Sequence, residues 1–138
     1  MYELWLAVHI VCAVVWAGGA VAIQILGRMY AASGDVAAML DFNRRAVRLA
    51  TWLFAPLAVV LIVAGVLLVE EVGYEYTAPW IVLGFLGLVF SLAVGVGYSS
   101  WEARRIDAAA GVRRVLAVNA LQVLVLLLVV VDMAVKPG

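Results

Sequence analysis

His9 is the residue of this sequence best suited to chemistry. It is the single histidine of the chain, and it lies within an apolar stretch that runs from Leu4 to Gly27. Neutral imidazole is a common ligand of haem iron and of other metal ions. An ionisable side chain inside a membrane is costly unless it is paired or ligated, which makes it a candidate for a functional site. The alternative is a histidine that packs and hydrogen-bonds against a neighbouring helix.

The residues that share a helix face with His9 predict a face turned toward other helices. Side chains three and four residues apart lie on one side of a helix. This side combines the two most polar side chains of the stretch, His9 and Gln24, with the central Trp16 and several small residues. Gly18 and Gly19 lie beside it and permit the close approach of another backbone or of a flat ligand. The residues of this face are His9, Ala13, Trp16, Ala20, Gln24 and Gly27.

Few other side chains in the sequence could hold a metal or catalyse a reaction. The chain has one histidine and one cysteine, Cys12, and these two residues cannot build a zinc site within a single chain. Soft sulfur ligands from Cys12 and Met133 leave a copper site open as an alternative. Asn119 and Gln122 share a helix face, and amides inside a membrane usually form hydrogen bonds between helices.

The composition predicts that membrane-spanning helices carry these residues. Of the 138 residues, 68% are hydrophobic and 13% are charged, whereas soluble domains are about 45–50% apolar and about 25% charged. Four stretches lack Asp, Glu, Lys and Arg, and a helix needs about 17–25 apolar residues to cross the bilayer core. We therefore predict an all-α, integral membrane four-helix bundle. It forms one domain over residues 1–138, with spans at about residues 3–28, 47–69, 78–101 and 114–134.

The charged residues predict the orientation of the bundle. Arginines occur in the segments that join the first span to the second and the third span to the fourth, whereas the segment between the second and third spans is acidic. Because basic segments face the cytoplasm, we expect both termini to lie outside, in a bacterial inner membrane. We expect the arginines to contact lipid headgroups and not nucleic acid. Residues 36–46 are amphipathic and predict a short cytoplasmic helix between the first two spans.

Two features of the middle spans bear on a ligand site. Pro56 interrupts the second span and frees the carbonyl of Trp52, which predicts a kink that is either simply tolerated or opens a cavity. In the third span, small residues recur at helical spacing. This spacing usually indicates close helix packing, and the alternative is a slot for a planar ligand. The residues are Gly84, Gly87, Ser91 and Gly95, with Tyr98 at the next position.

His9, Trp16 and Gly19 resemble the opening motif of the HemJ-type membrane proteins, a motif shared with the broader CopD-like families. Those proteins are similar in having a four-helix core, and they are linked to protoporphyrinogen oxidation and to b-type haem. The resemblance touches three of the four spans. It continues at Arg48, Pro56, Gly65, Asn119 and the closing pair Lys136-Pro137.

The resemblance implies that this chain binds haem b with His9 as an axial ligand of the iron. In this hypothesis the glycines of the first and third spans admit the macrocycle. Arg28, Arg48 or Arg105 pairs with a propionate if the haem lies toward the cytoplasm, whereas Tyr2, Trp5 or Lys136 is better placed if the propionates face outward, as the position of His9 near the outer end favours. Since the chain has one histidine, the sixth position is open, filled by another residue type, or filled by His9 of a second protomer in a homo-oligomer. The implied cofactor-binding residues are His9, Trp16, Gly19, Gly84, Gly87, Arg48 and Asn119.

Two positions depart from the HemJ-type pattern. Gly84 and Ala120 stand where the family has a lysine and a glutamate. Oxidation of a porphyrinogen needs groups that accept protons, so we expect this chain to keep the fold and the haem but to oxidise protoporphyrinogen poorly or not at all. Two alternatives remain. One is a CopD-like metal-handling or transport protein with His9, Cys12 and Met133 as ligands, and the other is a non-catalytic membrane subunit without a cofactor.

Overall fold

The first helix, α1, spans Tyr2–Ser33 and is the longest unbroken α-helix of the bundle. The computed structural model describes residues 1–105 and 108–135. At about 1.5 Å per residue, a helix of 32 residues is about 48 Å long, which exceeds the bilayer core of about 30 Å. Because the apolar stretch begins near its N-terminus, the C-terminal turns of α1 extend beyond the core.

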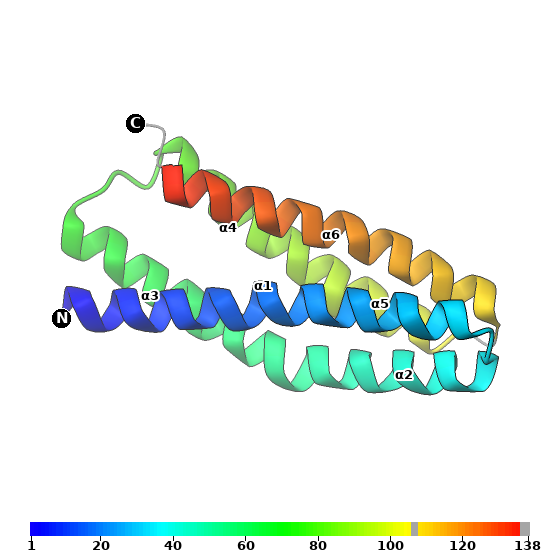
Figure 1. Ribbon diagram of the computed structural model, residues 1–138. Helices are drawn as coiled ribbons and strands as arrows, with labels where there is room; N and C mark the ends of the chain where they lie inside the picture. The colour runs from blue at the N-terminus through cyan, green and yellow to red at the C-terminus, as the bar shows by residue number, and fades with distance from the viewer. Residues whose placement is uncertain (106–107, 136–138) are drawn as a thin grey trace.

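A tight turn after α1 reverses the chain. Gly34 adopts a left-handed conformation with φ of 75°, which glycine reaches without steric cost and which commonly ends a helix. Asp35 then caps the next helix, since its carboxylate accepts a hydrogen bond of 3.0 Å from the backbone N–H of Ala38. Helix α2, Val36–Leu49, therefore runs back alongside the end of α1 (Figure 1).

The second span is continuous with α2. A π-helical segment η1, Ala50–Phe54, joins α2 to α3, Ala55–Val72, so that one helix of 37 residues runs from Val36 to Val72. In η1 the N–H of Ala55 bonds to the carbonyl five residues back, at Ala50. Pro56 follows immediately, and the helix bends here (Figure 1), as the proline predicted.

The helix predicted at residues 36–46 is present as α2, and it leads directly into the second span. It packs against α1 and α6. Met39 and Asn43 on its inner face are covered by the rest of the bundle. Its exposed face carries Arg44, Arg45 and Arg48 beyond the apolar part of the span.

The third and fourth spans complete an all-α bundle. The third consists of α4, Pro79–Leu92, a second π-helical segment η2, Ala93–Tyr98, and α5, Ser99–Ala103, and the fourth is α6, Ala109–Val135. The structure thus contains four helices long and apolar enough to cross a membrane, and no strand among the described residues. The predicted four-span helical fold is confirmed.

The bundle is built from two helix pairs. Helix α1 packs mainly on α3, and α4 packs mainly on α6, while α1 and α6 provide the principal contact between the pairs. The N-terminus and the end of α6 lie at the same end of the molecule, together with the α3–α4 connection (Figure 1). Following the distribution of arginines, we call this end the outer end. At this end the two pairs separate, and the cavities described below lie between them.

Small residues allow the helices to approach one another in the middle of the bundle. An added Cβ at Gly87 would clash with Val129 of α6, and one at Gly19 would lie 2.6 Å from the ring of Phe54. The ring of Phe54 in turn stacks on Trp16, with 5.9 Å between the ring centroids. The glycine spacing in α4 therefore marks helix packing against α6.

Candidate functional site

The imidazole of His9 is held in one orientation by α3. Its Nδ1 lies 3.2 Å from the backbone carbonyl oxygen of Leu61. A carbonyl can only accept a hydrogen bond, so Nδ1 carries the proton and Nε2 keeps its lone pair. Gly65, one turn further along α3, lies against the ring, because an added Cβ there would be 3.2 Å from Cε1 of His9. This arrangement leaves Nε2 available as a ligand or as an acceptor.

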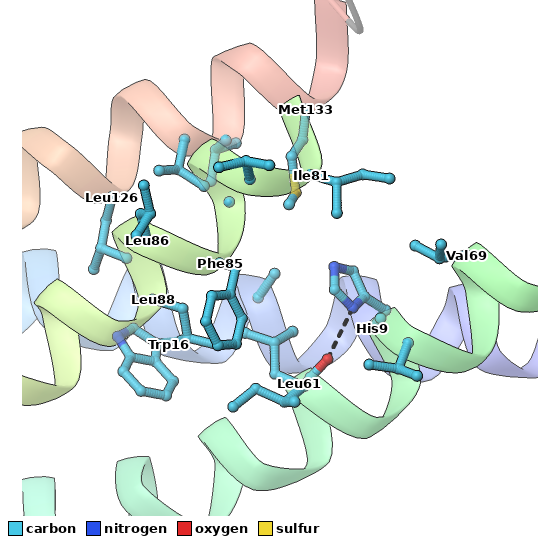
Figure 2. A pocket seen from close by; sticks show the side chains of 18 of the residues that line it. His9, Trp16, Leu61, Val69, Ile81, Phe85, Leu86, Leu88, Leu126 and Met133 are labelled. Atoms are coloured by element: carbon cyan, nitrogen blue, oxygen red, sulfur yellow. Dashed lines mark hydrogen bonds between the residues drawn. The ribbon is translucent and has the colours of Figure 1, made fainter. Parts of the chain in front are cut away.

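Nε2 faces a cavity of about 430 Å³ in the outer half of the bundle (Figure 2). This volume is within the range of about 300–1,000 Å³ that is usual for small-molecule sites. All four spans contribute to its wall, which is almost entirely hydrocarbon. Besides His9, its lining includes Ala13 and Trp16 of α1, Leu61, Gly65 and Val69 of α3, Ile81, Gly84, Phe85 and Leu88 of α4, and Leu126, Val130 and Met133 of α6.

A second cavity of about 630 Å³ lies against the same histidine. The two cavities share His9, Gly65 and Met133, so they are two parts of one cleft between the helix pairs. Its walls reach the lipid-facing surface, since Phe85 in the first part is 55% exposed and Val14 in the second part is 65% exposed. A lipophilic molecule could therefore enter from the bilayer.

Most heteroatoms of the first cavity already have partners. The indole N–H of Trp16 donates a hydrogen bond of 3.1 Å to a serine hydroxyl of α4, and the hydroxyl of Tyr76 donates one of 3.2 Å to Glu70. Among the described residues that line this cavity, Nε2 of His9 and Sδ of Met133 are left as side-chain atoms able to ligate a metal. No lysine or arginine belongs to that described lining.

The sequence matches the profile of a family described as "Predicted integral membrane protein (DUF2269)" over residues 3–137. The chain belongs to this family. No curated protein and no solved structure matches it. Membership and the four long apolar helices together indicate a multi-pass integral membrane protein. The resemblance to HemJ-type and CopD-like proteins is not part of this match and stays a prediction from the residues.

In this DUF2269 chain, three of the seven predicted cofactor-binding residues meet in one place. His9, Trp16 and Gly84 line the first cavity together. The structure does not bring the other four to it. Gly19 is covered by Phe54, and Gly87 packs on α6. Arg48 is exposed on α2. Asn119 lies away from the outer end, where its Oδ1 accepts a hydrogen bond from Ser99.

The metal site considered from the sequence is not assembled. Cys12 is buried but lines neither part of the cleft, so it does not join His9 and Met133. Among the residues that the structure describes, no group of three or more His, Cys, Asp and Glu side chains could hold a metal ion.

Of the two amides predicted to join helices, Asn119 accepts its hydrogen bond from Ser99 of α5, and Gln122 forms its bonds at the inner end of the cleft, as does Gln24 of α1. Gln122 Nε2 donates a hydrogen bond of 2.8 Å to the Oγ of Ser91, the same atom that accepts from Trp16. Gln24 Nε2 donates one of 3.0 Å to the carbonyl of Leu116. These bonds join α1 and α4 to α6 and form a polar layer at the inner end of the first cavity.

The sequence did not reveal Leu61 as the partner of His9. Its contribution is a backbone carbonyl, which every residue possesses, so the side-chain type carries no signal for it. Gly65 is the one residue whose type could have indicated this contact from the sequence. It lies one turn from the carbonyl of Leu61, and its lack of a side chain makes room for the imidazole ring.

Proposed function

We propose that this DUF2269 protein binds haem b in the outer half of a bacterial inner membrane, with His9 as an axial ligand. The observation that supports this most directly is the bond from Nδ1 of His9 to the carbonyl of Leu61. Metal-ligating histidines almost always donate their second ring N–H to a carbonyl, a carboxylate or water, which fixes the ring and leaves the other nitrogen for the metal.

The surroundings of His9 support the same assignment. The cavity wall is apolar and opens toward lipid, which suits a flat, hydrophobic macrocycle. Gly65 and Gly84 contribute no side chain to the wall. His9 is seven residues into α1, about 10 Å from the start of the helix. Since Arg48 is distant and no described lining residue is basic, the two carboxylates of haem are expected to face the aqueous outer surface.

The test is the absorption spectrum of protein purified from cells supplied with haem. We expect a Soret band in the wild type and its loss in His9→Ala. The control is Cys12→Ala, which removes the thiol of the same helix and should retain the band. Circular dichroism and gel filtration establish that each variant is folded. A haem-free wild type, or a full Soret band in His9→Ala, would refute the proposal.

One observation favours a second candidate. The described lining of the first cavity has no cation, and Nε2 of His9 is an acceptor, so a neutral lipophilic molecule that carries a hydroxyl donor also fits. Mass spectrometry of lipids extracted from the purified protein would detect it, with His9→Ala as the control. A protein that retains neither ligand would be assigned as a non-catalytic membrane subunit.

A further inference from the structure

Met133 reaches into the cavity from the wall opposite His9. It comes from α6, whereas His9 comes from α1, and Figure 2 shows both side chains directed into the space between them. Both residues also line the second part of the cleft. A ligand that fills the cleft beside His9 therefore also meets the thioether of Met133.

Gly84 is the reason that Met133 can take this position. A Cβ added at Gly84 would clash with the terminal methyl of Met133 and would lie 3.7 Å from its sulfur. The methionine side chain thus occupies the space that a larger residue of α4 would fill. Gly84 is buried, so the contact lies inside the bundle.

Within the first cavity, the chemistry of the lining leaves Met133 as the candidate ligand besides His9 among the described residues. Trp16 and Tyr76 have hydrogen-bond partners, and the remaining described lining residues of the first cavity, apart from His9 and Met133, are hydrocarbon or glycine. A thioether is a soft ligand, and the combination of methionine and histidine is an established pair of axial ligands that raises the reduction potential of haem iron.

We propose that Sδ of Met133 is the second axial ligand of the haem iron, opposite Nε2 of His9. This inference rests on the proposed function. It assigns a complete ligand pair within one chain, so that a low-spin iron needs no second protomer. It also adds α6 to the set of helices that hold the cofactor.

The test compares Met133→Leu with the wild type. Leucine conserves volume and hydrophobicity but cannot ligate iron. We expect the variant to retain haem through His9, to change from a low-spin to a high-spin spectrum, to bind carbon monoxide readily when reduced, and to show a lower reduction potential. Met29→Leu, at an exposed position of α1, is the matched control and should behave as the wild type.

A second variant distinguishes the loss of an iron ligand from a change in packing at position 133. Met133→His supplies a different ligand and should restore a low-spin spectrum, with a potential below that of the wild type. An unchanged low-spin spectrum and potential in Met133→Leu would overturn the inference while leaving His9 as ligand. A haem-free wild type would instead overturn the proposed function, and this inference with it.

Discussion

At the scale of single residues, the position of the His9 ring is decided by α3. The carbonyl of Leu61 fixes the proton on Nδ1, and the missing side chain of Gly65 leaves room for the ring. The helix that carries His9 thus does not orient it alone. Both contacts come from a segment more than fifty residues away in the sequence, so the orientation of the imidazole ring depends on how closely α1 and α3 pack.

Replacing Gly65 with valine should displace the imidazole. A Cβ alone would stand 3.2 Å from Cε1 of His9, and valine adds two methyl groups, so the ring must rotate away from Leu61. We expect a several-fold lower ratio of haem to protein, measured from the Soret and protein absorbance. Gly97→Val, where no neighbouring atom lies within 4 Å of the added Cβ, is the control and should retain haem. Equal haem content in the two variants would contradict this account of the site.

A second prediction at this scale concerns Ser91, which is fully buried. Its Oγ accepts hydrogen bonds from Trp16 and from Gln122. Ser91→Ala leaves the indole N–H of Trp16 without this acceptor, whereas Gln122 keeps its hydrogen bond of 3.2 Å to the carbonyl oxygen of residue 91. Burial of an unsatisfied donor costs about 1–3 kcal/mol, so we expect a clearly lower midpoint of thermal unfolding in detergent. Ser100→Ala, on the same span, should have little effect. A midpoint equal to that of the wild type would show that the polar layer does not contribute to stability.

At the scale of elements, each middle span contains one π-helical segment, and the two segments contact each other. Segment η1 ends just before Pro56, so the wider turn accommodates a residue that lacks a backbone N–H. It also carries Phe54, whose ring fills the space beside Gly19 and stacks on Trp16. The bend of the second span and its contact with α1 thus have a common origin.

This contact predicts different effects for two adjacent glycines. Gly19→Val should destabilise the bundle by about 1–3 kcal/mol through overpacking, because a Cβ there would lie 2.6 Å from Phe54, whereas no atom lies within 4 Å of a Cβ at Gly18. Thermal unfolding of Gly19→Val and Gly18→Val measures the difference. Adding Phe54→Ala should cost less in the Gly19→Val background than in the wild type. Strictly additive effects would contradict the contact.

At the scale of the whole molecule, the two helix pairs meet in the inner half, opposite the end we call outer, and diverge at the outer end. The inner half is packed more closely, since a Cβ added at Gly27 would clash with Leu116 and would lie 3.2 Å from Phe42. Amide hydrogen bonds join the helices here, and the cavity in this half holds about 50 Å³. The outer half contains the cleft, with His9 on one wall and Met133 on the other. This asymmetry predicts ligand access from the outer leaflet and not from the cytoplasm.

The orientation in the membrane is the prediction at this scale. Residues 28–48, which join the first span to the second, contain four arginines, and residues 104–114, which join the third span to the fourth, contain another four. The connection between α3 and α4 contains none. Basic segments stay in the cytoplasm. A reporter fused after Gly138 should therefore be exposed outside, and one fused after Gly111 should lie inside. A cytoplasmic signal at Gly138 would invert the assignment and place the cleft in the inner leaflet.

Taken by itself, the sequence determined the class of the protein. Long stretches without charge specify four spans, because a bilayer accepts only segments whose polar backbone is satisfied within a helix. The spacing of His9, Trp16 and Gln24 also specified the inward face of α1, and the structure confirms it: all three bond to other helices. These features are local, since each depends on residues within a few turns.

Only the tertiary structure decided what meets His9. It selected the carbonyl of Leu61, placed Gly84 and Met133 in the cleft, and left Arg48 and Asn119 outside it. It also joined α2 to the second span. The physical reason is that lipid is as apolar as the helix surfaces, so hydropathy does not choose partners between helices. That choice is made by shape and hydrogen bonds between residues distant in the chain, which exist only once the helices are packed.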